Sequence, residues 1–488
     1  MARRRNPYPA LVVMALIPAA GLFGLWRWAS GQQPDPIVAP TSPTSVPVVQ
    51  PAALTTPLLS VRRAPAVLSR VVNEAQFLEA LQPFVETLGP ASCFAVAVDG
   101  DEVITANAAA SLRPASNVKL ITAAVALEVL GPEFTYTTTV KGVVGADGVV
   151  AGDLYFVGGG DPVLNSIWWD GPNKHYPPFN RTAVESLADA ILAAGVTSIT
   201  GAVVGDASRY DSELYPPSWA AADQLVEGGP VSALLVNDSR ITATAASKDD
   251  PVVAAATVLT TLLEERGITV GDAAAAGQVP AASSTIASIV SQPLPAILAE
   301  MLTTSDNTTA EMVLKEIGLA RGNAGTREAG LAVVMSTLRT WDVPVDGLTL
   351  VDGSGLSDDD RATCGALLAV IEHGSLADGV GQGLAIGGAT GGTLFDEFVA
   401  GQPLSGVIRA KTGTLYNYAD GTGTDGKPGA KSLSGYVPRD DGSVIEFSLL
   451  LNGQQIAEEA QYRPFWTAMA AIFAEYPSGP TVQDLGPR

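Results

Sequence analysis

Three short motifs follow one another in this chain, and together they restrict its fold and its chemistry more than any other feature. They are Ser116-Asn117-Val118-Lys119, Ser305-Asp306-Asn307 and Lys411-Thr412-Gly413-Thr414. Each motif alone occurs by chance in a chain this long, but two serines and two lysines can carry out acyl transfer without a histidine. The only histidines, His175 and His373, lie outside the motifs, which disfavours a Ser-His-Asp triad.

The first motif is predicted at the start of a helix. Helix-forming residues run over 116–130, and Gly131-Pro132 ends the run. Ser116 and Lys119 are three positions apart and therefore share one helix face. The free N–H groups and the positive dipole end of the helix favour a negative charge that develops at Ser116. A capping serine beside a solvated lysine is the alternative for this motif alone, and the later motifs favour the catalytic interpretation.

The second and third motifs are predicted in a turn and in a strand. Ser305 and Asn307 are two positions apart between predicted helices over 294–302 and 309–319, so both side chains can face one cleft. A plain capping turn is the alternative. Gly413 lies inside a predicted strand, where a glycine indicates the close approach of a ligand or of another backbone segment.

The outer part of the chain is predicted to form an α/β fold in the broad sense (α+β), with a mostly antiparallel sheet. Alternating apolar residues predict strands over 92–98, 102–107, 407–415, 434–437 and 444–451. Helices over 71–88 and 457–474 would cover one face of this sheet. The helices that carry the first two motifs would cover the other face.

The interval between the first two motifs is far longer than a connection needs, and it has strand and helix patterns of its own. Strands are predicted over 136–140, 153–157, 199–205 and 240–245, and helices over 182–194 and 251–266. We therefore predict a catalytic domain over 68–132 and 294–476, an inserted α/β domain over 133–293, and a flexible tail over 477–488.

The N-terminus predicts export from the cytoplasm. Residues 1–31 begin with three arginines near the start of the chain, followed by an uncharged stretch that Arg27 ends, and about 20 such residues suffice to cross a bilayer. A retained anchor is favoured because Trp26 and Trp28 flank Arg27, and a cleaved export signal is the alternative. Residues 32–67 are rich in proline and predict a disordered tether. The catalytic part would then lie in the cell envelope, anchored at the outer face of the cytoplasmic membrane or secreted to the periplasm or cell-wall space.

Charge and cysteine content limit the partners and the cross-links. The formal net charge of −22 argues against nucleic acid and against anionic lipids as partners of the globular part. Contact with the membrane is therefore predicted through the N-terminal segment only. Cys93 and Cys364 could pair in an exported protein, but both lie in apolar runs, so two buried thiols are an open alternative. No cofactor and no metal site are predicted.

The chain resembles the class C low-molecular-mass penicillin-binding proteins, which are D-alanyl-D-alanine carboxypeptidases and endopeptidases of serine peptidase family S13. The resemblance covers roughly residues 68–476. It rests on the three motifs and on four further segments: Pro114-Ala115-Ser116, Leu130-Gly131-Pro132-Glu133-Phe134, Gly160-Asp161-Pro162 and Asp352-Gly353-Ser354-Gly355-Leu356-Ser357. A third domain, which some members hold within the insertion, is absent here, since only residues 247–250 stand at its position.

The resemblance implies a serine-type D-Ala-D-Ala peptidase that trims or un-crosslinks peptidoglycan stem peptides and is acylated by β-lactams. Ser116 would be the nucleophile and Lys119 the general base, with its pKa lowered from ~10.4 to about 7–8 by burial and by Lys411. Ser305 would relay a proton to the leaving amine, and Asn307 would hold the substrate amide.

The third motif would bind the substrate. Lys411 and Thr412 would take the terminal carboxylate, and Gly413 would let the substrate approach the strand. The backbone N–H groups of Ser116 and Thr414 would form the oxyanion hole.

Two alternatives belong to other classes. A β-lactamase with the same motifs is disfavoured because no Glu-x-x-x-Asn loop lies between the second and third motifs and because the interval between the first two is too long. A catalytically idle cell-wall-binding protein is disfavoured because every expected catalytic group is present.

The resemblance also implies that an aspartate and an arginine recognise the diaminopimelate side chain of the substrate. Asp223 is the candidate aspartate, and a carboxylate in a surface loop is the alternative. Where the arginine is expected, the chain has Asp358-Asp359-Asp360, and the nearest arginine is Arg361. Repulsion by this triplet predicts a preference for peptides with an amidated diaminopimelate carboxylate.

Overall fold

The computed structural model describes Arg27 and residues 64–171, 174–244, 247, 250–416 and 429–486. The chain divides into two compact units, residues 1–61 and 62–488. The anchor or export signal predicted over 1–31 and most of the tether predicted over 32–67 lie outside the described residues. Among the residues described, no helix combines the length and the apolar character needed to cross a membrane.

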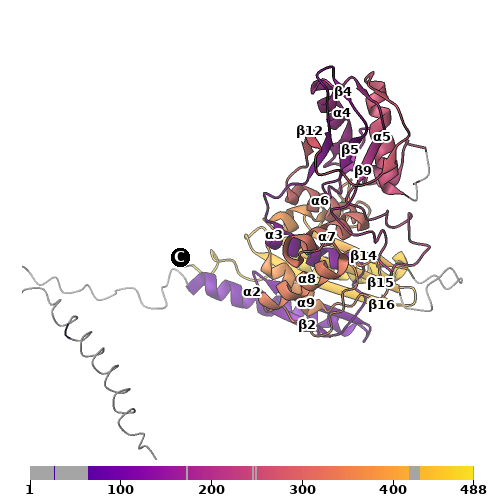
Figure 1. Ribbon diagram of the computed structural model, residues 1–488. Coiled ribbons are helices and arrows are strands. Elements are labelled where there is room, and N and C mark those ends of the chain that lie inside the picture. Colours follow the sequence, from indigo (N-terminus) through magenta and orange to yellow (C-terminus); the bar gives the residue numbers. More distant parts are fainter. Residues whose placement is uncertain are drawn as a thin grey trace, which may run out of the picture. The chain divides into compact units, whose positions relative to one another are not determined.

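A six-stranded antiparallel sheet forms the base of the second unit, in the strand order β13-β14-β15-β16-β1-β2 (Figure 1). This confirms the predicted fold class. The strands are β1 (Ser92–Val98), β2 (Asp101–Ala106), β13 (Ala385–Ile386), β14 (Arg409–Leu415), β15 (Gly429–Pro438) and β16 (Val444–Gly453).

Large and small side chains alternate along the central strands. Because successive residues point to opposite faces of a sheet, the large side chains lie on one face and the small ones on the other. In β1, Phe94 and Val96 point to one face, where they pack with Phe447 of β16. Cys93 and Ala95 point to the other face. On this face β1 and β16 pack against the helix formed by Cys364–His373.

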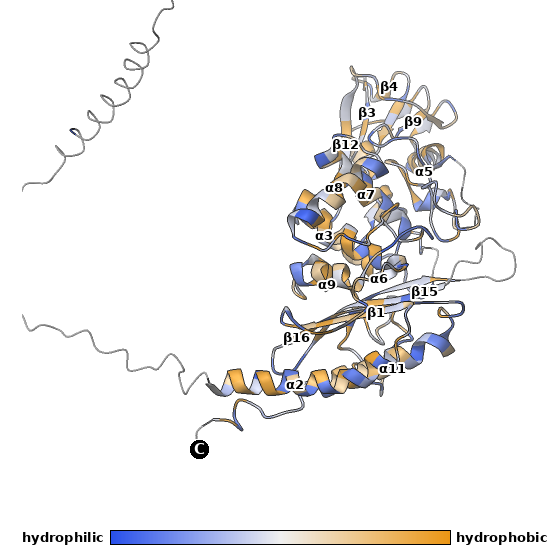
Figure 2. Cartoon of the chain, turned by 90° about the horizontal axis from the view of Figure 1, so that it is seen from below, coloured by the Kyte–Doolittle hydropathy of each residue, from blue (hydrophilic) through white to orange (hydrophobic). Residues whose placement is uncertain are grey.

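Helices cover both faces of this sheet, as predicted (Figure 2). Helices α2 (Ala64–Glu86) and α11 (Glu459–Glu475) share one core with the large side chains of the strands. The opposite face packs against helices α3 (Val118–Leu130), α6 (Leu294–Thr304), α7 (Asn307–Gly322), α8 (Arg327–Thr340), α9 (Cys364–His373) and α10 (Gly379–Gly383).

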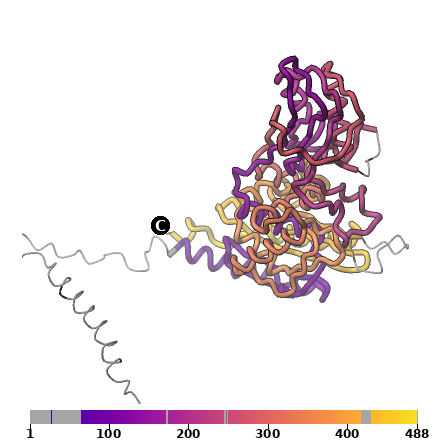
Figure 3. The backbone as a smooth tube through the Cα atoms, in the orientation of Figure 1, coloured from indigo at the N-terminus to yellow at the C-terminus, as the bar shows by residue number. Residues whose placement is uncertain are grey.

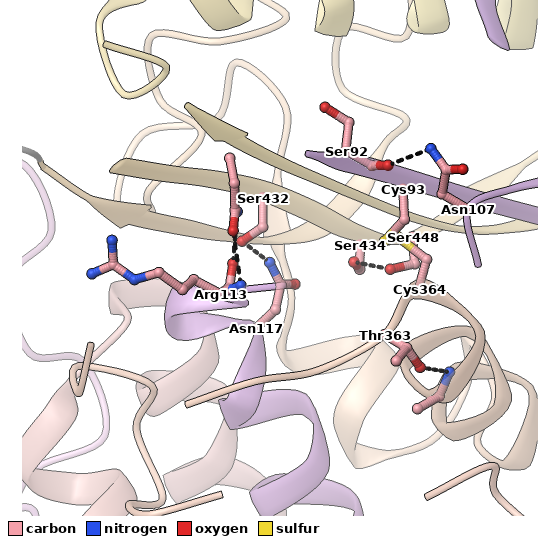
Figure 4. Close-up of a disulfide and its surroundings, with 12 residues drawn as sticks. Ser92, Cys93, Asn107, Arg113, Asn117, Thr363, Cys364, Ser432, Ser434 and Ser448 are labelled. Carbon is pink, nitrogen blue, oxygen red and sulfur yellow. Dashed lines mark hydrogen bonds between the residues drawn. A yellow bond between two sulfur atoms is a disulfide. The ribbon is translucent and has the colours of Figure 1, made fainter. Parts of the chain in front are cut away.

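Cys93 and Cys364 form a disulfide, with their Cα atoms 5.8 Å apart (Figure 4). The bond joins β1 to the first residue of α9, so it links the sheet to the helical layer on the motif side. The structure therefore decides between the two alternatives that the sequence left open.

The chain leaves this framework after α3 and returns at α6, and the residues between have a sheet and a core of their own (Figure 3). A five-stranded sheet has the order β11-β9-β5-β3-β12, and a parallel three-stranded sheet has the order β10-β8-β4. The elements are β3 (Thr137–Gly142), β4 (Val149–Val150), β5 (Leu154–Val157), β6 (Leu164–Asn165), β7 (Thr182–Ala183), α4 (Val184–Ala193), β8 (Ser198–Ile199), β9 (Val203–Asp206), η2 (Asn237–Ser239), α5 (Pro251–Glu265), β10 (Thr269–Val270), β11 (Ala275–Ala276) and β12 (Ser284–Val290).

The strand predicted over 240–245 is wrong for the residues that the structure describes there, 240–244. A short 3-10 turn, Asn237–Ser239, precedes them, and all three of its residues have positive φ angles of 49–66°. The Asn237 side chain is buried and donates to Ser166 Oγ at 3.0 Å. These contacts hold the turn that precedes residues 240–244. Residues 241–244 themselves form a bend and a turn, although their alternating pattern suggested a strand.

The C-terminal segment begins on the surface of α2. Ser69 Oγ donates to the Pro480 carbonyl at 2.7 Å, and the Gly479 N–H donates to Asn73 Oδ1 at 2.5 Å. The first residues of the predicted flexible tail are therefore held by hydrogen bonds. The domain boundaries at 132/133 and 293/294 stay predictions, since residues 62–488 form one compact unit.

Candidate active site

Ser116 lies in a 3-10 turn, Ala115–Asn117, and the α-helix begins two residues later than predicted, at Val118. Ala115 has a φ of 48°, a left-handed conformation that non-glycine residues rarely adopt. The Asn117 side chain donates to Ser432 Oγ, which in turn donates to the Pro114 carbonyl at 2.7 Å (Figure 4). Strand β15 thus holds the turn that presents the candidate nucleophile.

Lys119 is fully buried beneath Ser116. Its Nζ atom lies 3.1 Å from Ser116 Oγ, 2.5 Å from Asn307 Oδ1 and 2.8 Å from the Ser354 carbonyl oxygen. Burial lowers the pKa of Lys119 to about 8, although the carboxylates of Asp352 and other buried acids act in the opposite direction. The structure therefore brings the first two motifs together around one lysine.

Lys411 occupies a matching position beneath Ser305. Its Nζ atom donates to Ser305 Oγ at 2.8 Å and to the Thr412 carbonyl at 2.8 Å. Burial holds the pKa of Lys411 well below its usual range, and repulsion from Lys119 lowers it further. We expected burial and repulsion from Lys411 together to lower the pKa of Lys119, and burial is the cause found there.

Two local conformations present the second motif. Ser305 ends α6 with a φ of 66°, and Asp306 caps α7 by accepting the Thr309 N–H at 2.5 Å. Asn307 is the first residue of α7, and its Nδ2 donates to the Glu227 carbonyl at 2.7 Å. Both ends of the Asn307 amide are therefore engaged.

Gly413 is the point at which β14 approaches the turn Ala115–Asn117 that carries Ser116. A Cβ atom there would lie 2.2 Å from Ser432 Oγ, 2.9 Å from the Pro114 carbonyl oxygen and 3.0 Å from the Ala115 Cβ. The close approach that a glycine in a strand predicted is therefore an approach of backbone and small side chains.

A cleft of about 500 Å³ joins the three motifs. Its lining includes Ser116, Ser305, Asn307, Thr412, Gly413 and Thr414. The side chains of Lys119 and Lys411 lie below its surface. No three His, Cys, Asp or Glu side chains among the described residues form a group that could hold a metal ion.

Asp223 does not line this cleft. It is half-buried at the start of a turn in which its carbonyl oxygen accepts the Glu227 N–H at 2.8 Å. Glu227 and Val226, at the other end of the turn, do line the cleft. Burial raises the pKa of the Asp223 carboxyl.

The acidic triplet does not act as we expected. Asp360 is fully buried and accepts the Val351 N–H at 2.8 Å, and Asp358 pairs with buried Arg113. Neither they nor Asp359 lines the cleft, and Arg361 donates to the carbonyls of Asp358 and Asp360. The repulsion argument for amidated substrates is therefore wrong in its physical basis.

Asp352 is a supporting residue that pattern reasoning missed. Its carboxylate accepts the N–H groups of Ser354, Gly355 and Ser357 at 2.6–3.1 Å and the indole N–H of Trp219 at 2.9 Å. This fixes the loop whose Ser354 carbonyl contacts Lys119. The run of glycines and serines after an aspartate was a signal for such a turn.

Lys431 is the second residue that was missed. It lies on β15 opposite Thr414, donates to Thr414 Oγ1 at 3.0 Å and lines the cleft. No motif marked it in the sequence.

The comparisons with known proteins agree with this geometry. The sequence profile of the D-Ala-D-Ala carboxypeptidase 3 (S13) family matches residues 80–250 and 244–476. A D-alanyl-D-alanine carboxypeptidase of an Actinomadura species is 29% identical over 422 residues, which cover 72% of this chain and 76% of the relative. Carboxypeptidase DacB of Mycolicibacterium smegmatis is 29% identical over 373 residues, 72% of this chain and 74% of the relative.

A solved structure shows the same fold. Penicillin-binding protein 4 of Haemophilus influenzae superimposes with a TM-score of 0.64 at 20% identity, over 81% of this chain and 99% of that one.

Proposed function

This chain belongs to the D-Ala-D-Ala carboxypeptidase 3 (S13) family of serine peptidases, and from that membership we propose that it cleaves peptidoglycan stem peptides ending in D-Ala-D-Ala through an acyl-enzyme at Ser116. The observation that carries the proposal is the contact between Ser116 Oγ and the buried amine of Lys119 at 3.1 Å.

The partners of Lys119 suit a general base. A neutral amine has two N–H donors and one lone pair. The Asn307 Oδ1 and the Ser354 carbonyl oxygen can only accept, so they take the two N–H groups. The lone pair then faces Ser116 Oγ and can receive its proton as the oxygen attacks the carbonyl of the penultimate D-alanine.

Ser305 and Lys411 would return a proton to the leaving group. The Ser305 hydroxyl faces the cleft and Lys411 Nζ lies 2.8 Å behind it, so a proton can pass through the hydroxyl to the amine of the departing D-alanine. Water would then resolve the acyl-enzyme by passing a proton through Ser305 back to the neutral Lys411, and Ser116 would regain its proton from Lys119.

Asn307 has a positioning role beside its proposed contact with substrate. Its Oδ1 orients Lys119, while its Nδ2 donates to the Glu227 carbonyl. A substrate amide carbonyl would replace the Glu227 carbonyl as the acceptor of this Nδ2 group.

Strand β14 would hold the substrate backbone. Its neighbour β13 pairs only with Arg409 and Ala410, so residues 411–415 offer an edge toward the cleft. Thr412 would bind the terminal carboxylate together with Lys411, and the N–H groups of Ser116 and Thr414 would stabilise the oxyanion. Asp223 stays a candidate for contact with the substrate side chain only through movement of its turn.

We propose two further properties on the same basis. β-Lactams, which mimic the D-alanyl-D-alanine end, would acylate Ser116. The protein would work in the cell envelope, with residues 1–31 as a membrane anchor or as a cleaved export signal.

The test is stoichiometric labelling of the purified protein by a fluorescent penicillin, followed by denaturing gel electrophoresis. A stable one-to-one label is expected, whereas a β-lactamase would lose the label within seconds and an idle wall-binding protein would never acquire it. Incubation with a defined stem pentapeptide and with cross-linked stem dimers would then divide carboxypeptidase from endopeptidase activity.

A further inference from the structure

A segment of the inserted region, residues 174–180, reaches the rim of the cleft, and the proposed reaction does not use it. We call this segment the strap. The ring of His175 stacks on the ring of Phe395, with the two centroids 4.6 Å apart and the two planes 13° apart. Tyr176, the next residue of the strap, lines the cleft, as Phe395 does. The strap therefore joins the inserted region to the loop between β13 and β14.

The other end of the strap is anchored on α6, the helix that leads into the second motif. Glu300 of α6 is 7% exposed and accepts the N–H groups of Phe179 and Asn180 at 3.0 and 2.6 Å. Asn180 Nδ2 also donates to the Ala296 carbonyl at 2.6 Å. Hydrogen bonds to a carboxylate are among the strong ones, so this anchor fixes the segment firmly. The strap is thus held on α6 at one end and on Phe395 at the other.

The strap lies at the end of the cleft where the leaving group is expected. Thr412, the proposed contact of the terminal carboxylate, donates through Oγ1 to Thr393 Oγ1 at 2.9 Å, and Phe395 follows two residues later. A substrate paired antiparallel with β14 would point its C-terminus toward β13, which is antiparallel to β14 on the same edge and begins at Ala385. The leaving residue would then lie between Thr412, Thr393 and the strap.

The two substrates that the proposed function leaves open differ at this end. D-Alanine leaves with a methyl side chain. The residue released from a direct cross-link also has a carboxylate beside its amine, but it carries the second stem in place of the methyl group. Both leaving residues can use the same carboxylate contacts, so the space around the side chain is the feature that separates them.

We propose that the strap limits the size of the leaving residue and so favours release of D-alanine over the cutting of cross-links. His175, Tyr176 and Phe395 would be the specificity-determining residues. This inference rests on the proposed function, because it takes the direction of the substrate from the role of Thr412.

Two peptides provide the test, because they differ only in the side chain of the leaving residue. One is a stem pentapeptide that ends in D-Ala-D-Ala, and the other ends in D-Ala-D-Lys with its side-chain amine acetylated, which leaves the longer side chain uncharged. The ratio of their kcat/KM values, acetylated D-Lys over D-Ala, should be below about one tenth in the wild type.

Phe395→Ala removes the partner of His175 and should raise this ratio about tenfold. Phe395→Tyr keeps the ring stack and should keep the ratio within about threefold of the wild type. Phe179→Ala is the matched control, because it is the same exchange within the strap at a ring that is 51% exposed and does not line the cleft. Cleavage of cross-linked stem dimers, relative to the pentapeptide, should also rise in Phe395→Ala and not in Phe179→Ala.

A second arm does not depend on turnover. In a Ser116→Ala background the ratio of the calorimetric Kd values of the two peptides is compared with and without Phe395→Ala. If the wild type hydrolyses neither peptide but this ratio shifts about tenfold toward the longer side chain, the proposed function fails and the size limit stands.

Three results would overturn the inference even if hydrolysis occurs. The wild type could cleave both peptides equally fast, Phe395→Ala could leave both ratios unchanged, or it could slow both peptides equally. In each case the stack of His175 on Phe395 would only hold the inserted region in place. Absence of both hydrolysis and a shift in the Kd ratio would overturn the proposed function and the inference together.

Discussion

Gly355 lies directly against Ala115, the residue before Ser116: a Cβ atom on Gly355 would be 1.9 Å from the Ala115 carbonyl oxygen. Gly355 also has a φ of 79°, and Ala115 one of 48°. The loop that fixes the Lys119 partner and the turn that presents Ser116 therefore share one tight backbone contact.

Gly355→Ala should displace the nucleophile turn, because neither backbone segment can absorb the added atom. We expect penicillin acylation to slow by at least about tenfold and the free energy of unfolding to fall by about 1–3 kcal/mol. Gly401→Ala is the matched control, since Gly401 has a similar φ of 88° but open space around its Cβ position. Equal acylation rates in the two variants would contradict the importance of this contact.

Ser116→Ala should abolish covalent penicillin labelling while the protein stays folded. Intact-mass spectrometry after incubation with a penicillin measures the label, and circular dichroism checks the fold. A residual adduct above a few per cent of the protein would mean that another residue is the nucleophile.

Lys119→Arg should lose acylation almost as completely, because a guanidinium cannot be deprotonated and therefore cannot act as a general base. The larger head group must also fit where Nζ contacts three oxygens at 2.5–3.1 Å. Wild-type acylation rates in this variant would rule out a lysine base at position 119.

The rate of acylation should rise with pH. Since the pKa of Lys119 is lowered to about 8 and the base must be neutral, the rate constant should increase about tenfold per unit below pH 8 and level off above it. A stopped-flow pH profile of penicillin acylation measures this. Lys431 has a pKa of similar value, so the inflection must persist in Lys431→Met. A rate that falls between pH 6 and 8 would show that the cationic form of Lys119 is the active one.

Removal of the disulfide should destabilise the fold without removing the active site. A bond that closes so long a loop restricts the unfolded chain, and we expect Cys93→Ala/Cys364→Ala to lose about 2–5 kcal/mol of unfolding free energy in urea titrations. Penicillin labelling at 25 °C should remain. An unchanged urea midpoint would mean that the packing around the two cysteines, and not the bond, holds β1 to α9.

The residues of the three motifs were predicted from sequence to lie together, and the residues that support them were not. Ser116, Lys119, Ser305, Asn307 and Lys411 meet at 2.5–3.1 Å because short motifs combine chemistry with local spacing. The distances between motifs depend on packing that no single motif encodes.

Supporting residues depend on contacts that are remote in sequence. Lys431 reaches Thr414 only because the two are cross-strand neighbours, and the strand pairing is not visible in either segment alone. The acidic triplet was misinterpreted for the same reason, since its sequence suggested repulsion of a substrate carboxylate, whereas Asp360 is buried and Asp358 is paired with Arg113.

The bond between Cys93 and Cys364 closes a covalent ring that contains the whole inserted region together with the first and second motifs. A single proteolytic nick inside this ring cannot release a fragment, because both pieces remain joined through sulfur. Nicked protein should therefore migrate as one species without reductant and as two with it. An exported enzyme built this way can suffer a cut in the loops of its insertion and still keep Ser116, Ser305 and Lys411 on one connected molecule.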